Sequence, residues 1–222
     1  MQKGLSNDFE DRRWSNVDQS FCFRHKAALD FINPNQTLLD LGCGDGLFLE
    51  IAKQKGVICT GADQSEVALN KCRGRLGDNV NLVKLDVASD ALPFTQNSFE
   101  AVSLLDVLEH VLEPEKLLNE ARRVSLKYII ISIPNFSSLP ARLQCLFGQV
   151  PENNKPKKGH VYWFNYVVLK KILEDNSLEI VELKYNTQGG NIPGIKQLLM
   201  LLGKILPNLF ALSFVILAEK ES

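Results

Sequence analysis

Two acidic residues and a histidine stand close together in the stretch LLDVLEHVLEP. Asp106, Glu109 and His110 occupy positions i, i+3 and i+4, so a helical turn would project their side chains from one face. A carboxylate next to a histidine can act as a base with its orienting partner, which suits removal of a proton from an attacking hydroxyl. The same triple can instead hold a divalent cation, or form structural hydrogen bonds only. The sequence leaves these three interpretations open.

A glycine-rich turn follows an apolar run in LLDLGCGDG. Gly42, Gly44 and Gly46 stand at alternate positions before a helical pattern, so the backbone can turn sharply and let a ligand approach the free N–H groups of a helix start. A dinucleotide fingerprint would place its third glycine, or an alanine, where this chain has Leu47. Asp45 would also repel a pyrophosphate but not an ammonium or a sulfonium. Spacing and charge therefore favour S-adenosylmethionine.

Acidic residues end the next two predicted strands. Asp63 follows the glycine turn by about 20 residues, where a carboxylate can accept hydrogen bonds from both ribose hydroxyls, and Gln64 should lie beside the adenosine. Asp86 ends the third strand, where it can accept from an adenine amino group while Val87 offers a backbone N–H. A lone aspartate is often a helix cap or turn residue. The order and spacing of these residues instead indicate a ligand crevice at one edge of a parallel sheet.

Short apolar runs alternate with helical patterns along the chain, which predicts a parallel sheet with crossover helices. Ser65 and Asn165 are expected helix caps, and Pro114 suits a first helical position. We add Asp40, before the glycine turn, and Leu105, after the fourth strand, to the predicted cofactor-binding residues. The expected strands are Thr37–Leu41, Val57–Ala62, Asn81–Leu85, Phe99–Leu104, Tyr128–Ile133, Leu178–Tyr185 and Ala211–Glu219, and the expected helices are Gly46–Lys55, Ser65–Arg75, Pro114–Val124 and Tyr166–Asp175.

These segments resemble the class I methyltransferase family in its type 11 branch, through LDLGCGDG and DVLEHV. The chain is also similar to MetW-like proteins around LGCGDG, IPNF and RLQCLFG. The resemblance covers about Arg24 to Val181. It implies an α/β fold with a doubly wound, Rossmann-like seven-stranded sheet, strand order 3-2-1-4-5-7-6 and an antiparallel seventh strand. It also implies backside attack on the sulfonium methyl of S-adenosylmethionine.

The resemblance extends to the acidic-x-x-Glu-His pattern. Relatives that methylate quinone precursors or the ribose of small RNA have a similar pattern, and the latter add a later histidine. His160, in KKGHVYWF, would then join Asp106, Glu109 and His110 in a metal cluster. Asp106 replaces the usual glutamate, and its shorter reach weakens the case for a metal. We therefore predict His110, Glu109 and His160 as catalytic residues and no bound metal.

Composition limits the classes of protein that fit. The chain has 222 residues, 45% of them hydrophobic, and a formal net charge of −1. We therefore expect one domain over residues 1–222 and no nucleic-acid partner, since there is no overall positive field. Five cysteines without a CxxC pair predict reduced thiols and a cytoplasmic location. Lys204, Pro207 and Asn208 interrupt the apolar stretch 198–218, so we expect no transmembrane segment, with transient contact with a membrane surface as an alternative.

Three segments are expected as additions to the sheet and its helices. Residues 1–33 should form an amino-terminal cap in which Arg24 either pairs with the methionine carboxylate or is solvated. Residues 135–160 and 189–209 are expected as substrate-side insertions. The second has apolar residues spaced to lie on one face of a helix, which suits either a helix covering the sheet or a lid over a hydrophobic substrate.

The predicted activity is O-methylation of a small or lipid-linked metabolite that carries a sugar or quinone-like hydroxyl, and the acceptor is the expected partner. One alternative is a MetW-like partner protein that serves an acyltransferase in methionine biosynthesis with little activity of its own. The other is a metal-dependent RNA ribose 2′-O-methyltransferase. The sequence does not indicate an oligomeric state.

Overall fold

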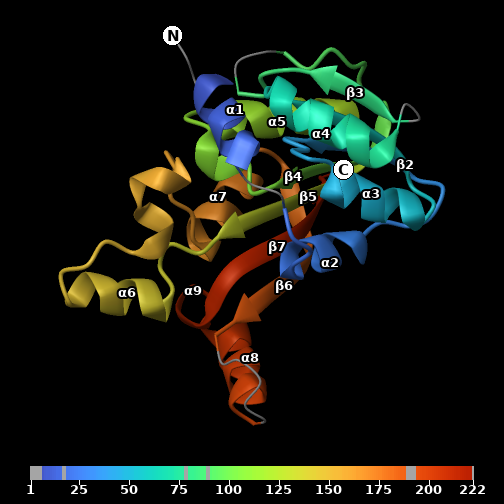
Figure 1. Ribbon diagram of the computed structural model, residues 1–222. Coiled ribbons are helices and arrows are strands. Elements are labelled where there is room, and N and C mark those ends of the chain that lie inside the picture. Colours follow the sequence, from blue (N-terminus) through green and yellow to red (C-terminus); the bar gives the residue numbers. More distant parts are fainter. Residues whose placement is uncertain (1–6, 17–18, 78–79, 89–90, 189–193, 222) are drawn as a thin grey trace.

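A seven-stranded sheet forms the centre of the computed structural model, which describes residues 7–16, 19–77, 80–88, 91–188 and 194–221 (Figure 1). The strand order is β3-β2-β1-β4-β5-β7-β6, and β7 pairs antiparallel with both β5 and β6 while the other neighbours pair in parallel. The predicted α/β fold and strand order are therefore confirmed. The strands are β1 (Thr37–Leu41), β2 (Ile58–Asp63), β3 (Asn81–Lys84), β4 (Phe99–Leu105), β5 (Ser125–Pro134), β6 (Leu178–Thr187) and β7 (Ala211–Lys220).

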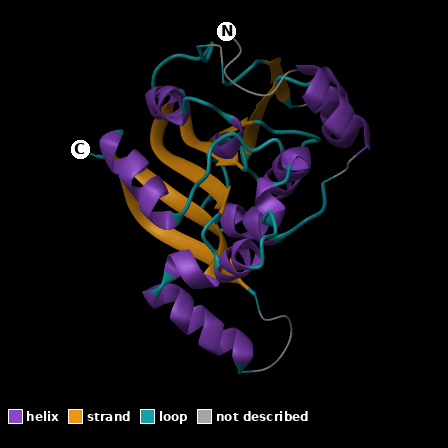
Figure 2. Ribbon diagram, turned by 90° about the vertical axis from the view of Figure 1, so that its left-hand side faces the viewer, coloured by secondary structure: helices purple, strands orange, loops and turns teal. Residues whose placement is uncertain are grey.

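Helices cover both faces of the sheet (Figure 2). One buried cluster joins the sheet to α2, α3 and α4, and the other joins it to α5 and α7. The described helices are α1 (Asn7–Asn16), α2 (Phe23–Leu29), α3 (Leu47–Gln54), α4 (Glu66–Leu76), α5 (Pro114–Val124), α6 (Leu139–Leu146), α7 (Tyr166–Asp175), α8 (Ile195–Ile205) and α9 (Pro207–Phe210). Parts of the predicted segments 1–33 and 189–209 lie outside the described residues.

The predicted helix starts occur where the sequence places them. The Ser65 side chain accepts from the N–H of Ala68 at 3.1 Å, and the Asn165 side chain accepts from the N–H of Val168 at 3.0 Å. Pro114 is the first residue of α5. Each of these residues satisfies or removes an N–H that would otherwise lack a partner in the first turn, so the helices begin there.

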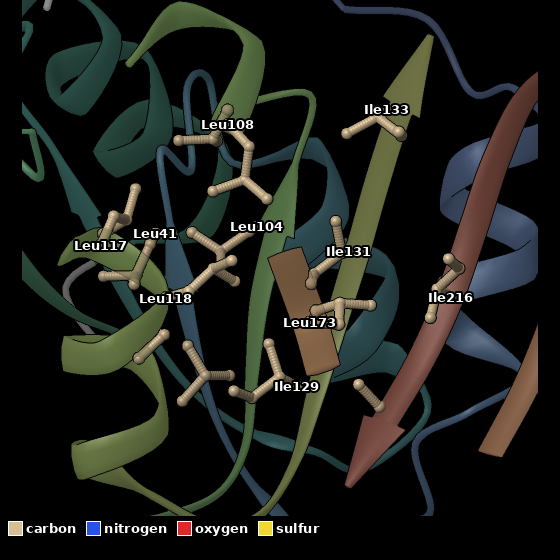
Figure 3. Close-up of a cluster of buried hydrophobic side chains, with 14 of the residues drawn as sticks. Leu41, Leu104, Leu108, Leu117, Leu118, Ile129, Ile131, Ile133, Leu173 and Ile216 are labelled. Carbon is tan, nitrogen blue, oxygen red and sulfur yellow. The ribbon is translucent and has the colours of Figure 1, made fainter. Parts of the chain in front are cut away.

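The larger core cluster lies beneath the strands that end at the candidate site (Figure 3). Leu104 in β4 and Ile131 in β5 pack with Leu118 of α5, and each of these side chains is completely buried. Strands buried on both faces are nearly continuous apolar runs, as in YIIISI of β5. This packing fixes the strand ends rigidly enough to position side chains at the carboxyl edge of the sheet.

Helix α8 exists, but it does not bury its apolar stripe against the sheet. Leu198, Leu201 and Ile205 are 55%, 57% and 69% exposed. The helix touches the rest of the fold through Gly203, which lies against the ring of Tyr185. The interpretation of this segment as a covering for the sheet is therefore wrong. None of the helices in the described ranges has both the length and the hydropathy needed to cross a bilayer.

Candidate active site

A cleft opens at the carboxyl ends of β1, β2, β3 and β4. Its volume is about 720 Å³ including the open mouth, which suits a ligand of nucleoside size or somewhat larger. Acidic and amide groups alternate with apolar side chains along its walls. The lining residues are Glu10, Arg13, Trp14, Gln19, Arg24, Gly42, Asp63, Gln64, Asp86, Val87, Ala88, Leu105, Asp106, Val107, His110 and Val111.

The glycine turn forms the floor of the cleft. Gly42 and Gly44 have φ angles of +75° and +56°, and a Cβ at Gly42 would lie 2.6 Å from a methyl carbon of Val107. A Cβ at Gly44 would lie 2.3 Å from the Trp14 ring. Gly46, with φ of +79°, precedes α3 and lies against Cys72. Of the three predicted glycines, Gly42 lines the cleft, whereas Gly44 and Gly46 shape the turn beneath it.

Asp63 is held in place by the backbone around it. Its two carboxylate oxygens accept from the N–H of Gly44 at 2.9 Å and of Ser65 at 2.8 Å. Burial raises the pKa of Asp63, while these two donors oppose the rise. Beside it, the Gln64 Oε1 atom is buried and has no hydrogen-bond partner among the residues that the structure describes. The cleft therefore contains a fixed carboxylate next to an acceptor that is free to receive a donor from a ligand.

The third and fourth strand ends complete the walls. Asp86 accepts from the N–H of Ala88 at 3.0 Å, which fixes the turn after β3. Val87 and Leu105 line the cleft as predicted positions, together with Val107. An apolar slot with polar groups at its ends can accept a flat ring with amino and hydroxyl substituents.

Helix α1 supplies lining residues that sequence reasoning missed. Glu10, Arg13 and Trp14 come from α1, and Gln19 follows it. Trp14 is 6% exposed although α1 is otherwise polar, because its ring lies on the glycine turn. A lone tryptophan in a charged helix is a weak signal for such a contact. Burial also raises the pKa of Glu10.

Asp45 does not face the cleft, contrary to the electrostatic argument from the sequence. It is completely buried, and its carboxylate pairs with the Arg75 guanidinium at 3.0 Å and accepts from the N–H of Gln19 at 3.0 Å. Arg75 compensates its charge. Asp45 therefore ties α4 and the segment after α1 to the glycine turn, and it does not discriminate between ligands by repulsion.

Asp106 is separated from Glu109 and His110. The predicted helical turn is a single 3₁₀ turn over Leu108–His110, and Asp106 precedes it with a left-handed φ of +56°. Its carboxylate accepts from the Ser132 hydroxyl at 2.5 Å and pairs with Arg24 at 3.1 Å. Asp106 is therefore not on one face with the other two. Arg24 does line the cleft, but its partner in this structure is Asp106.

His110, His160 and Glu109 come together through two elements. His110 Nδ1 lies 3.0 Å from the Gly159 carbonyl, and His160 Nδ1 lies 2.7 Å from the Asn153 carbonyl. Because a carbonyl only accepts, both Nδ1 atoms are protonated, and the Nε2 atoms of the neutral rings are bare acceptors. His160 Nε2 is 4.0 Å from Glu109 Oε1. One ligand atom from each of the three residues lies within 4.8 Å of the others.

Burial sets the charge of this trio. Glu109 is 1% exposed, and its Oε2 has no hydrogen-bond partner in the described ranges, so desolvation, helped by the charge of Asp106, raises its pKa well above the usual value. Burial also lowers the pKa of His110 to about 4 and lowers that of His160. Burial therefore favours the uncharged forms of these three side chains, a protonated carboxyl and two neutral imidazoles. Only His110 reaches the cleft, so Glu109 and His160 stand behind it.

Asp40 lies in β1 below the cleft and does not line it. The Ser103 hydroxyl donates to its carboxylate at 2.6 Å, and burial raises its pKa to about 7. A folded-state pKa above the unfolded value of 3.8 means that stability is lost as the pH rises from there through about 7. The structure thus places Asp40 within the sheet, where its side chain links β1 to β4.

This linkage predicts that Asp40→Asn stabilises the fold more at high pH than at low pH. The amide keeps an acceptor for Ser103 but cannot ionise. Between pH 5 and pH 8 the stabilisation relative to the wild type should grow by about 3 kcal/mol. Urea unfolding across this range measures it, with the exposed Asp175→Asn as control. Parallel pH profiles for Asp40→Asn and the wild type would contradict it.

Comparisons with known proteins agree with this geometry. Residues 23–181 match the model of the family described as "Methionine biosynthesis protein MetW". The chain belongs to the MetW family. A ubiquinone biosynthesis O-methyltransferase of Hahella chejuensis is 30% identical over 129 residues, which are 53% of this chain and 54% of that relative. The match thus spans about half the length of this curated relative.

Solved structures share the fold of this MetW family member. The complex between the Haloferax volcanii Trm112 methyltransferase activator and the putative methyltransferase contains a chain with a TM-score of 0.68 and 14% identity, covering 98% of this chain and 100% of that one. Magnesium protoporphyrin IX methyltransferase from Synechocystis PCC 6803, solved with S-adenosylhomocysteine, has a TM-score of 0.63 and 19% identity, covering 97% and 95%. The fold is that of class I S-adenosylmethionine-dependent methyltransferases.

Proposed function

We propose that this protein is an S-adenosylmethionine-dependent O-methyltransferase. The observation that supports it most is the pairing, inside one cleft, of the fixed Asp63 carboxylate with the buried and unpartnered Gln64 Oε1. Each Asp63 oxygen accepts one backbone donor and has a further lone pair for a ribose hydroxyl. Val87 and Leu105 would flank the adenine, and Gln64 would accept from an N–H of the ligand.

Several residues would hold the cofactor, which supplies an electrophilic methyl group on a sulfonium. Gly42 leaves room for the ligand at the turn, and Trp14 closes the cleft from above the glycines. Asp86 lines the cleft after the end of β3, where its carboxylate would accept a hydrogen bond from the adenine amino group. Neither Asp40 nor Gly44 would touch the cofactor, because Asp40 is bonded to Ser103 within the sheet and the Gly44 N–H is used to hold Asp63.

His110 would take the proton of the acceptor hydroxyl. Its Nδ1–H donates to the Gly159 carbonyl, which leaves the Nε2 lone pair of a neutral ring available. Glu109 and His160 would act as positioning residues, since they stand behind His110. A protonated Glu109 can donate toward His160 Nε2 after a small approach, which satisfies the buried carboxyl without a cation.

We infer that the acceptor is a small or lipid-linked hydroxyl compound of the quinone type. The support is the similarity to ubiquinone biosynthesis O-methyltransferases and the apolar Leu105, Val107 and Val111 along the cleft. The cytoplasmic location predicted from the thiols remains a prediction.

Calorimetry with S-adenosylhomocysteine tests the cofactor site. We expect one molecule bound per chain in the micromolar range or tighter, with quenching of the fluorescence of Trp14, which lines the cleft. Trp163 is 60% exposed and does not line the cleft, so Trp163→Phe should keep the quenching while Trp14→Phe removes most of it. If S-adenosylhomocysteine at millimolar concentration releases no heat and leaves the fluorescence unchanged, the proposal is wrong.

The family match favours a second candidate function. Residues 23–181 match a family that is described by methionine biosynthesis and not by methyl transfer, which fits a protein that serves another enzyme of that synthesis. Under this alternative the chain would bind the cofactor but transfer methyl groups feebly, and would co-purify with an acyltransferase. A screen of catechol and sugar acceptors with the purified chain, followed by the same screen after addition of the acyltransferase, separates the two functions.

A further inference from the structure

We propose that α6 and α8 together form a docking surface for an anionic lipid bilayer. This α6–α8 surface consists of exposed apolar side chains from the two helices and the residues that follow them, and its members are Leu139, Leu143, Leu146, Phe147, Val150, Ile195, Leu198, Leu201, Ile205 and Leu206. Leu146, Phe147 and Ile205 are 76%, 75% and 69% exposed. Scattered exposed leucines are ordinary, but ten exposed apolar side chains gathered on and directly after two projecting helices indicate an interaction site.

Hydrogen bonds join the segment before α6 to the segment that follows α8. The Asn135 side chain, before α6, donates to the carbonyls of Asn208 and Ala211 at 3.1 and 2.7 Å, and the Ser137 hydroxyl donates to the Asn208 carbonyl at 3.3 Å. These bonds join the start of α6 to the turn after α8, and both helices extend away from the sheet in Figure 1. They can therefore meet one surface together.

The strand directions place this surface near the cleft. Helix α6 follows β5, and α8 comes after β6. Because β7 is antiparallel to both, β5 and β6 run in the same direction and end at the sheet edge where the cleft opens. A bilayer bound at α6 and α8 would thus face the side of the molecule where an acceptor enters.

Charge favours an anionic partner. The segments 135–151 and 183–218 contain no aspartate or glutamate, whereas Arg142, Lys196 and Lys204 are present on the two helices. All three cations are exposed, and the described part of the chain shows no acidic partner for them. Lysine and arginine beside an aliphatic stripe are typical of helices that lie in the headgroup region of a membrane.

Composition and symmetry disfavour the other occupants. Protein-binding hot spots are rich in tryptophan, tyrosine and arginine and poor in leucine, and lysine is depleted at protein interfaces. The α6–α8 surface is instead mostly leucine and isoleucine with two lysines, and it has one arginine and no tryptophan or tyrosine. A two-fold dimer through this surface would bring Lys196, Lys204 and Arg142 of both copies into one interface, to which the segments 135–151 and 183–218 contribute no acidic group.

Vesicle sedimentation tests the proposal on the full chain. We expect binding to vesicles of 3:1 phosphatidylcholine and phosphatidylglycerol, weaker binding to pure phosphatidylcholine, and weaker binding in 0.5 M NaCl. The double variant Phe147→Glu with Leu201→Glu should lower the partition coefficient by about tenfold or more. The matched control is Leu126→Glu, because Leu126 is 54% exposed, close to the 57% of Leu201, but lies near the start of β5 at the opposite edge.

The outcomes separate this inference from the proposed methyl transfer. Binding of S-adenosylhomocysteine by the double variant should equal that of the wild type, which also shows that the variant folds. The proposal is overturned if the wild type stays in the supernatant with anionic vesicles, or if Leu126→Glu loses as much binding as the double variant. It is also overturned if light scattering shows that the wild type is a dimer and the double variant a monomer, while neither protein sediments with vesicles.

Discussion

Asp63→Ala should weaken the binding of S-adenosylhomocysteine by about 100-fold, because two hydrogen bonds from hydroxyls to a carboxylate are lost together. The same change leaves the N–H groups of Gly44 and Ser65 without their acceptors, so the glycine turn also loses its fixed shape. Calorimetry measures the dissociation constant. Melting temperatures of the free proteins show how much of the loss comes from destabilisation.

Asp63→Asn separates the two contributions. The amide keeps one oxygen for a backbone N–H but offers an amide NH₂ where the other carboxylate oxygen was, so its affinity should lie between those of Asp63→Ala and the wild type. Asp175→Ala, an exposed change on α7, is the control and should bind normally. A dissociation constant for Asp63→Ala within threefold of the wild type would exclude this carboxylate as a ribose ligand.

The sheet was predictable from the sequence because its signals are local. The seven apolar runs, the caps at Ser65 and Asn165, and Pro114 at a helix start each depend on neighbours within a few residues. The strand order came from family resemblance. Helix α8 shows the limit of periodicity, since a one-faced apolar pattern predicts a helix but does not say what covers the face.

The walls of the cleft were only partly predictable because several contacts join distant residues. Asp45 and Arg75 are thirty positions apart, and nothing near Asp45 indicated that its charge would be compensated. Trp14 reaches Gly44 from a polar helix. The left-handed conformation of Asp106 breaks the i, i+3, i+4 pattern, and the Ser132 hydroxyl and Arg24 that hold it come from other elements. Tertiary contacts such as these leave no periodic pattern in the sequence.

His110→Ala should lower the rate constant of methyl transfer by roughly 100- to 1,000-fold, which is the usual contribution of a general base. The affinity for S-adenosylhomocysteine should change little, because the proposed cofactor contacts come from Asp63, Gln64 and Asp86. Single-turnover kinetics with a catechol acceptor give the rate, and calorimetry gives the affinity. A variant that loses affinity and rate in the same proportion would show that His110 only shapes the cleft.

The pH dependence of this effect follows from the surroundings of His110. Burial lowers its pKa to about 4, so the ring stays neutral through the physiological range and becomes protonated only near that value. The ratio of the wild-type rate to the His110→Ala rate should therefore be constant from pH 8 to about pH 5.5. A ratio that already falls near pH 6.5 would mean that the ring titrates like a solvated imidazole.

Glu109→Gln tests whether a proton or a divalent cation balances the charge of the buried Glu109 carboxylate beside His110 and His160. If Glu109 is in the protonated form that its burial favours, the amide can replace the carboxyl as a donor toward His160, and the rate should fall by less than about tenfold. Treatment with a chelator should then leave the wild-type rate unchanged. If a divalent cation completes the site instead, the chelator would abolish the rate and Glu109→Gln would cost as much as His110→Ala, because the amide removes the only anionic ligand of the trio. The two sets of results do not overlap, so the protonation state of one buried carboxyl distinguishes base catalysis from metal-assisted methyl transfer.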